Sequence, residues 1–513
     1  MKKTDISTCK WAKWLLDGLV LLAIIFIGYK LTSQYEVHAL CLDDFSFSRL
    51  FEKSYFELLS RDLHTYSKFR PVSSFVIWMC CVIVKQKIYL FTYILWAMNI
   101  ASALILYFVV RQWTKMRICS FFSAICFLVS RFAYYDSNQI LGLMEGTSLV
   151  LAVLMLFFLH RYLEHPKENE RDFFIAFIFY TLTSLSHERF LALYPCFIVV
   201  GLIAYWRNRE IRGLKLMTVT ILCFICLFVL RFIILGRNAM MGTNNDNILD
   251  TFSFEQAILF LFNSFVYLFG INGLTEAWMN GIFWNNVEPI VQIEVYFAIA
   301  AIMLLVIAFT ACVSKKKEAQ MILSNIMLIL SFIVLSIIPA CTTIRLELRW
   351  MYVPYVGFLV LISYMACVLV QSTGDTHILN YTFKVIGTGV ILAYGVLNFS
   401  AETYYRQYWP NLYYWKTQLT ANKVYDETVA RYGDDIWGYD SIVLIGSLPQ
   451  LPENFLEPYR PDGINADSIP QVYWYESADT IPAEISNGKT IVLQEADPPE
   501  VPGDITVIAR DLS

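Results

Sequence analysis

The sequence predicts an all-α protein that crosses a membrane many times and carries a small α/β domain after its last span. Three observations support this prediction. Of the 513 residues, 57% are hydrophobic and 16% are charged, well below the roughly 25% charged residues of soluble domains. Many apolar runs reach the about 20 residues that a helix needs to cross a hydrocarbon core of about 30 Å. After residue 400, short β-branched runs alternate with Pro and Gly.

Charge and cysteine content exclude other classes of protein. The formal net charge is −4, which provides no large basic surface, so no nucleic acid partner is expected. The 12 cysteines lie mostly within apolar runs, where a thiol behaves as a small hydrophobe, and none has the spacing of metal ligands. Cys41 and Cys341 fall in predicted outer loops and could be bridged, but we expect free thiols.

Basic clusters predict how the chain is threaded through the membrane. Four lysines precede an apolar run from Trp14 to about Leu31, and no small-residue cleavage site follows, so we expect an uncleaved first helix with a cytoplasmic amino terminus. Later basic clusters fall on the same side when about 11 spans alternate, which leaves the carboxyl terminus outside the plasma membrane. The predicted spans cover about 14–31, 88–110, 118–135, 139–160, 172–187, 190–206, 215–235, 291–313, 321–340, 351–371 and 383–399.

Two apolar runs do not fit this alternation as spans. The run at about 71–84 has the length of a re-entrant or interfacial segment, and a crossing at about 252–271 would reverse every later span. We expect both as outer-leaflet helices, with 34–70 as the first outer loop and 1–400 as the membrane module. Residues 401–513 then form an interfacial helix rich in Tyr and Trp and an extracytoplasmic α/β domain. Its predicted strands lie near 441–446, 490–493 and 505–508.

Two adjacent acids, Asp43 and Asp44, lie in the first outer loop close to the end of the first span. Group transfer to a hydroxyl needs a carboxylate within hydrogen-bond reach to accept the proton. Either acid could be the carboxylate that accepts this proton, and the other acid could tune that carboxylate. Alternatively, both could only keep the loop solvated.

Two more charged clusters are predicted at the outer boundary. Arg70 precedes Pro71 at the start of the short apolar run, and its planar guanidinium suits a phosphate, although an interfacial anchor is an equal alternative. His187, Glu188 and Arg189 lie between two apolar runs with almost no loop. Ionisable groups there are costly, so they indicate a functional site unless they only form the turn.

The most specific pattern runs from Ile344 to Gly357 and enters a span from outside. Arg345 and Arg349 are four residues apart and would share a face on a helix, with Glu347 to one side. Two guanidinium groups at headgroup level offer bidentate phosphate recognition. The alternative is an interfacial anchor with an internal ion pair.

At these residues the chain resembles the C-type (GT-C fold) glycosyltransferases, in particular the protein O-mannosyltransferase group and its tetratricopeptide-carrying relatives. Asp43-Asp44 stands where that group pairs acids after its first span. Arg70-Pro71 matches its Arg-Pro, and His187-Glu188 is similar to its Lys-Glu at an outer turn.

The last pattern carries the most specific part of the resemblance. Glu347-x-Arg349-x-x-Tyr352-x-Pro354-x-x-Gly357 is similar to a Glu-x-Arg-x-x-Tyr-x-Pro-Ser-x-Gly signature, with Tyr355 in place of the serine. The resemblance covers about residues 14–400 and does not extend to the carboxyl-terminal domain.

The resemblance implies an inverting transfer of a sugar from a polyprenyl-phosphate-linked donor on the outer face of the membrane. It makes Asp43 the general base, with Asp44 a close second. No cofactor and no metal is implied. The donor phosphate is expected to be held by Arg345, Arg349, Arg70, His187 and Arg189, and the supporting residues are Glu188, Glu347, Tyr352 and, in the second outer loop, Asp136 or Glu145.

Acceptor and partners are expected from the same resemblance. Tetratricopeptide repeats are absent from the sequence, so we expect a bacterial envelope polysaccharide, a teichoic acid or a lipid-linked glycan as acceptor. A polyprenyl-phosphate glycosyltransferase that charges the carrier inside and a flippase would precede this step. Three alternatives stay open: an envelope polysaccharide polymerase of the O-antigen type, which would not require the acid pair; a lipid or glycan transporter, which would show two related halves with broken helices; and a non-catalytic scaffold.

Overall fold

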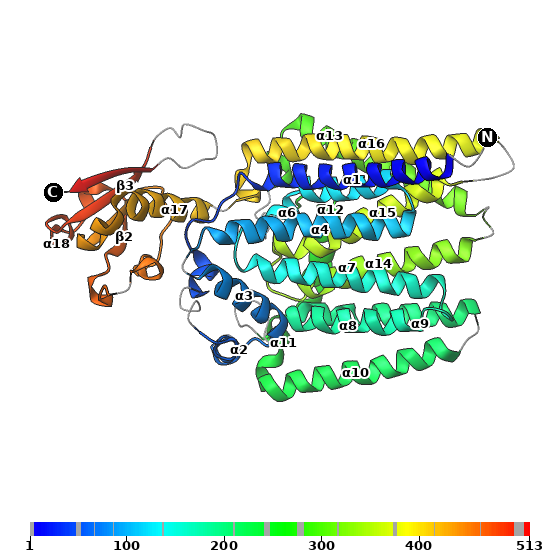
Figure 1. Ribbon diagram of the computed structural model, residues 1–513, viewed down its shortest axis with the longest axis horizontal. Helices are drawn as coiled ribbons and strands as arrows, with labels where there is room; N and C mark the ends of the chain where they lie inside the picture. The colour runs from blue at the N-terminus through cyan, green and yellow to red at the C-terminus, as the bar shows by residue number, and fades with distance from the viewer. Residues whose placement is uncertain are drawn as a thin grey trace.

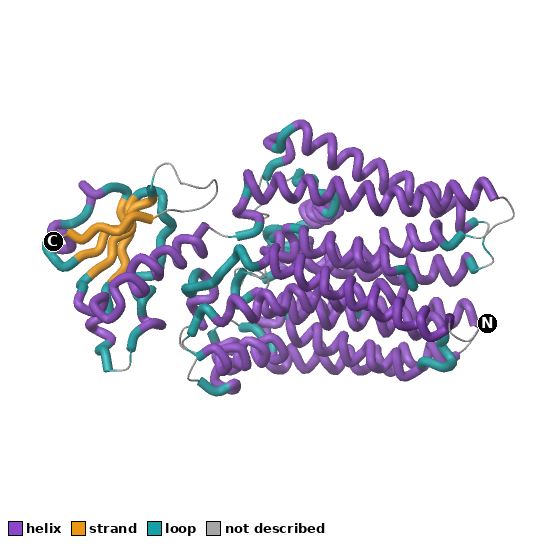
Figure 2. The backbone as a smooth tube through the Cα atoms, turned by 45° about the horizontal axis from the view of Figure 1, so that its top comes forward, coloured by secondary structure: helices purple, strands orange, loops and turns teal. Residues whose placement is uncertain are grey.

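A bundle of long helices and a small domain that contains a β-sheet make up the computed structural model, with the amino terminus and the sheet at opposite ends (Figure 1, Figure 2). Nine helices in the described part of the chain are long and apolar enough to cross a membrane. The prediction of a helical, multi-span membrane protein with a small α/β domain is therefore confirmed. The structure describes residues 5–47, 53–65, 67–85, 87–135, 138–208, 211–240, 247–273, 282–314, 316, 318–372, 377–414, 416–461, 463–496 and 507–512.

A helix occupies each of the predicted spans, but three of these helices, α5 (Arg117–Val129), α8 (Glu170–Ser186) and α9 (Pro195–Asn208), are short. α5 has 13 residues and α8 has 17, so length does not confirm the predicted count of spans. The span predicted at about 190–206 is built by the 3₁₀ turn η2 (Glu188–Leu193) followed by α9. The other long helices are α1 (Asp5–Thr32), α4 (Leu90–Thr114), α7 (Gly142–Glu164), α10 (Ile211–Leu235), α13 (Pro289–Val313), α14 (Ala319–Cys341), α15 (Tyr352–Val370) and α16 (His377–Tyr408).

The short helices α2 (Tyr55–His64), α3 (Pro71–Val84) and α11 (Ile248–Thr251) lie at the end of the bundle that carries the sheet (Figure 1). α3 and α12 (Phe254–Tyr267) each have 14 residues, as expected of segments too short to span. Pro71 begins α3, where its missing N–H costs nothing. The predicted first outer loop, 34–70, holds the 3₁₀ turn η1 (Leu42–Phe47) and α2, which starts with a capping box between Ser54 and Glu57. α6 (Arg131–Tyr135) and α11 are single turns.

The transition to the carboxyl-terminal domain differs from the sequence prediction. α16 continues through Ser400, where a separate interfacial helix was expected, as far as Tyr408. No proline lies between the start of α16 and Pro410, so the last span extends directly into the aromatic stretch. α17 (Lys416–Tyr425) follows and leads into the domain.

The sheet has four strands in the order β2-β1-β3-β4. β1 (Ser441–Ile445) pairs in parallel with β2 (Gln471–Tyr475) and β3 (Thr490–Glu495), and β4 (Val507–Leu512) pairs antiparallel with β3. The central β1 is buried along its whole length, as its run of aliphatic residues predicts. Three strands match the predicted runs. β2 was not predicted, because its polar and aromatic residues lack the aliphatic signal, and α18 (Ala483–Ser486) precedes β3.

Two helices mark the extremes of packing in the bundle. α15 is buried at all but two of its residues and lies in the centre of the bundle. α10 lies at the edge (Figure 1) and buries only Gly213, Thr220, Arg231 and Leu235. Because an arginine is one of the few buried residues of a peripheral helix, α10 brings a charge into the protein rather than an apolar face.

Candidate functional site

A cavity of about 660 Å³ lies at the end of the bundle nearest to α2 and α3. Its walls come from the first outer loop, α3, the turn after α8, α10, α14 and the segment before α15. Apolar side chains form part of the lining, among them Phe228, Met240, Ile248 and Ile338. A cavity lined by both apolar and charged side chains suits an amphipathic ligand.

Positive charge dominates the polar part of this cavity. Among the residues that the structure describes, seven Lys and Arg side chains line it, against three carboxylates, Asp43, Asp62 and Glu188. Fixed cations in a water-poor pocket attract and hold an anionic group such as a phosphate. The seven cations are Arg61, Lys68, Arg70, Arg189, Arg231, Arg345 and Arg349.

The two adjacent acids point in different directions. Asp43 is exposed and lines the cavity. Asp44 is 1% exposed, and its carboxylate accepts hydrogen bonds from the backbone N–H groups of Ile140 (2.6 Å) and Leu141 (2.8 Å). Burial raises the pKa of Asp44 to about 7, although these two hydrogen bonds oppose the shift. Asp44 therefore ties the loop to the start of α7, and Asp43 remains available to a ligand.

Arg70 and Glu188 form a bidentate ion pair between α3 and the turn after α8. Arg70 donates from Nε to Glu188 Oε2 and from Nη2 to Oε1, both at 2.6 Å. Lys68 Nζ lies 3.9 Å from Oε1 and His187 Nδ1 lies 3.7 Å from Oε2 of the same carboxylate. The sequence patterns predicted that Arg70, His187 and Glu188 lie at the same boundary of the membrane. The structure shows that these three side chains are in direct contact.

A second ion pair continues this network below the cavity. Arg189 donates to Glu145, which is 1% exposed near the start of α7. His187 Nε2 lies 4.0 Å from Glu145 Oε1. Glu145 is not among the cavity-lining residues that the structure describes, so it neutralises Arg189 rather than facing the ligand. Asp136, the other acid considered for this place, lies outside the described residues.

Arg345, Glu347 and Arg349 converge without sharing a helix face. The segment before η7 (Leu348–Met351) is not helical, and Glu347 has an extended backbone. Its carboxylate accepts from Arg345 Nε at 2.8 Å and pairs with Arg349 through its second oxygen. Both arginines line the cavity. Tyr352 is 2% exposed and packs on Phe127 in the core, away from the cavity lining.

Arg231 is the main residue that the sequence analysis missed. It was not among the predicted site residues, yet it is 6% exposed and lines the cavity from α10. Within the described part of the chain it has no hydrogen bond and no ion pair. An arginine inside an apolar run is costly, and that cost was the signal that could have identified it. Arg61 and Asp62, on α2, also line the cavity and pair with each other at 2.9 Å.

The thiols of Cys41 and Cys341 are both free and buried, as expected. Among the described residues, no three His, Cys, Asp or Glu side chains are grouped as metal ligands. The absence of a metal requirement stays a prediction.

Comparisons with known proteins give likeness of fold only. No family model and no curated protein matches the chain. The chain is similar to the archaeal oligosaccharyltransferase AglB from Archaeoglobus fulgidus, solved with an inhibitory peptide and a dolichol-phosphate, at 13% identity and TM-score 0.45 over 94% of this chain and 70% of AglB. It is also similar to ArnT from Cupriavidus metallidurans bound to undecaprenyl phosphate, at 11% identity and TM-score 0.44 over 98% and 97%. Both are GT-C membrane glycosyltransferases, the class that the motifs resemble.

A third solved structure is an oligosaccharyltransferase from Archaeoglobus fulgidus tethered to an acceptor peptide, at 12% identity and TM-score 0.46, with 92% of this chain and 65% of that chain covered. The chain therefore spans about two thirds of the length of the oligosaccharyltransferases and nearly all of ArnT. At these scores the likeness concerns the arrangement of helices. Function is argued below from the side chains of the cavity.

Proposed function

We propose that the protein is a membrane glycosyltransferase that moves a sugar from a polyprenyl-phosphate-linked donor to a hydroxyl of an envelope glycan on the outer face. One observation supports this most: the exposed carboxylate of Asp43 shares a cavity with seven cations and with apolar side chains. The lipid phosphate, the lipid chain and the acceptor hydroxyl each find matching chemistry there.

The donor phosphate is held by the arginines. Each of Arg70 and Arg189 already has a carboxylate partner, whereas Arg345 and Arg349 share the single carboxylate of Glu347. Arg345 and Arg349 line the cavity from this side, and the buried Arg231 adds a further positive charge from α10. A phosphate between them receives charge-assisted hydrogen bonds, which are about twice as strong as neutral ones.

The reaction needs one base and one stabilised leaving group. The Asp43 carboxylate takes the proton of the acceptor hydroxyl as its oxygen bonds to the anomeric carbon. The bond from that carbon to the phosphate oxygen breaks, and the electron pair leaves with the lipid phosphate. The arginines stabilise the charge that develops on this oxygen, so no acid is needed there. Attack opposite to the leaving group inverts the anomeric centre.

The test is sugar transfer by the purified protein in lipid nanodiscs. Radiolabelled hexoses linked to undecaprenyl phosphate serve as donors, and envelope glycan fractions serve as acceptors. Asp43→Asn keeps the shape of the side chain and removes the base, so we expect turnover to fall by about 100-fold or more with donor binding unchanged. Arg349→Ala should weaken donor binding.

Asp435→Asn is the matched control, because Asp435 is an exposed acid of the carboxyl-terminal domain, far from the cavity lining. It should transfer sugar at the wild-type rate. If Asp43→Asn also transfers at the wild-type rate, Asp43 is not the base. If the protein reconstituted in sealed liposomes moves the donor across the bilayer without consuming it, the protein is a transporter, and if only pyrophosphate-linked oligosaccharides are extended, it is a polymerase.

A further inference from the structure

The segment 36–41 lies directly before the acid pair and is packed between the two parts of the protein. Val37 and Leu40 are buried in a cluster with residues of α3 and α4. Ala39 and Cys41 are buried in the hydrophobic core of the carboxyl-terminal domain. Residues of this one short segment therefore belong to two different cores, and the segment cannot move without disturbing one of them.

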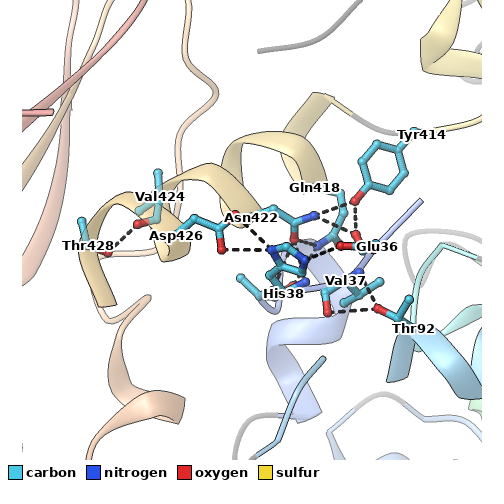
Figure 3. Close-up of polar contacts among 11 residues, drawn as sticks. Glu36, Val37, His38, Thr92, Tyr414, Gln418, Asn422, Val424, Asp426 and Thr428 are labelled. Atoms are coloured by element: carbon cyan, nitrogen blue, oxygen red, sulfur yellow. Dashed lines mark hydrogen bonds and ion pairs between the residues drawn. The ribbon is translucent and has the colours of Figure 1, made fainter. Parts of the chain in front are cut away.

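Polar side chains of α17 fix the same segment through its backbone (Figure 3). Asn422 Oδ1 accepts from the N–H groups of His38 (2.9 Å) and Ala39 (3.3 Å), and its Nδ2 donates to Glu36 O (2.7 Å). Gln418 Nε2 donates to Ala39 O (2.8 Å). These contacts pair residues more than 370 positions apart in the chain, so they order the loop from outside its own sequence.

Gln418 also reaches the residue at which the acid turn begins. Its Oε1 accepts from the thiol of Cys41 at 2.9 Å. The backbone N–H of Asp44 then donates to Cys41 O at 3.0 Å and closes a turn around Leu42 and Asp43. The far side of the turn is held by the carboxylate of Asp44.

Leu42 adopts a backbone conformation that its side chain opposes. Its φ is 49°, in the left-handed region that residues other than Gly and Asn rarely occupy. The Leu42 side chain is 42% exposed, so packing does not compensate for this conformation. Such strain persists only when the surrounding structure over-determines the backbone, and here Cys41 and Asp44 are fixed on either side.

We propose that Gln418 and Asn422 are positioning residues: α17 of the carboxyl-terminal domain clamps residues 36–41 and thereby holds the strained turn at Leu42 that points Asp43 into the cavity. This inference rests on the proposed function, because Asp43 is taken as the base. It assigns a role to the carboxyl-terminal domain, which contributes no residue to the cavity lining within the described part of the chain.

The clamp is tested in the full-length protein in nanodiscs with the undecaprenyl-phosphate-linked donor. Gln418→Ala and Asn422→Ala should each lower kcat by about tenfold, the effect of losing about 1.4 kcal/mol of positioning hydrogen bonds. KM for the donor should stay within about twofold, since the arginines that bind it are held by the bundle. Arg431→Ala is the control, because Arg431 pairs with Glu427 on the surface of the same domain.

Two further readouts separate positioning from damage to the fold. Leu42→Asn introduces a residue that tolerates positive φ, so it should restore most of the kcat lost in Gln418→Ala. Cys41, buried at 1% exposure, should react faster with a membrane-impermeant maleimide in both clamp variants. Equal kcat in wild type and clamp variants, or no rescue by Leu42→Asn, would overturn the clamp. Absence of transfer by the wild type would instead reject the proposed function.

Discussion

Arg231 provides a test in which stability and function should change in opposite directions. Its guanidinium is 6% exposed and has no hydrogen bond or ion pair within the described residues, although it lies in a cavity beside the Arg70–Glu188 pair. Burying an unpaired charge costs several kcal/mol, and apolar replacements of buried charges often stabilise proteins by about 1–4 kcal/mol. Arg231→Met keeps the length of the side chain and removes the charge, so the unfolding free energy should rise by about 1–3 kcal/mol.

The same substitution should weaken binding of the donor. A hydrogen bond to a charged group contributes about 1.5–3 kcal/mol, and each 1.4 kcal/mol is a factor of about ten in affinity. We therefore expect Arg231→Met to raise the Kd for undecaprenyl phosphate by about 10- to 100-fold. Arg231→Lys keeps the charge without the planar fork and should fall between wild type and Arg231→Met.

Both quantities are measured on the same nanodisc preparations, by thermal unfolding and by titration with undecaprenyl phosphate. Arg212→Met is the matched control on the same helix, because Arg212 is 67% exposed and pairs with Glu170 on the surface. It should change neither quantity appreciably. A less stable Arg231→Met variant with unaltered affinity would refute the reasoning, since Arg231 would then be a structural residue.

Three further predictions concern the groups around the cavity. Asp44→Asn leaves one of two backbone N–H groups without an acceptor and should lower the unfolding free energy by about 1–3 kcal/mol in chemical denaturation, more than Asp43→Asn does. The hydrogen bonds of His38 to Asp426 (3.0 Å) and Glu36 raise its pKa from 6.5 to about 9. Protonated His38 therefore stabilises the folded protein by about 1 kcal/mol after allowance for its partly exposed partners. This stabilisation is complete below pH 6.5 and is lost as the pH rises through about 9. The stability difference from His38→Gln should therefore vanish by about pH 10, and one that grows with pH would contradict the assignment. Glu347→Gln leaves two cations less neutralised, so the thermal midpoint should fall and added undecaprenyl phosphate should restore more of it than in wild type.

The helices of the bundle could be predicted from the sequence because lipid offers no hydrogen-bond partners to the backbone. Each span must form its backbone hydrogen bonds within itself, so long apolar runs become helices. The short run that begins at Pro71 also formed a helix, with the predicted bounds. The continuation of α16 to Tyr408 was missed because aromatic residues are compatible with both a span end and an interfacial helix.

Part of the charged site was also predictable from local patterns. Arg70 and Glu188 were each placed at the outer boundary from their sequence neighbours, and the structure joins them by two hydrogen bonds. The separate orientations of Asp43 and Asp44 could not be predicted, because Asp44 is fixed by backbone groups 96 and 97 residues away. Arg231 could not be assigned to the cavity from the sequence, because hydropathy does not tell which side of a helix faces the protein.

The packing of residues 36–41 has a consequence for biosynthesis. This segment follows the first helix, but its partners Tyr414, Gln418, Asn422 and Tyr459 follow the last one. A chain emerging from the ribosome must therefore insert all of its helices before the first loop can adopt its final conformation, and contacts of such long sequence separation form late. We expect partly synthesised chains to be inserted yet inert, so the protein can acquire activity only after the carboxyl-terminal domain has been synthesised and folded.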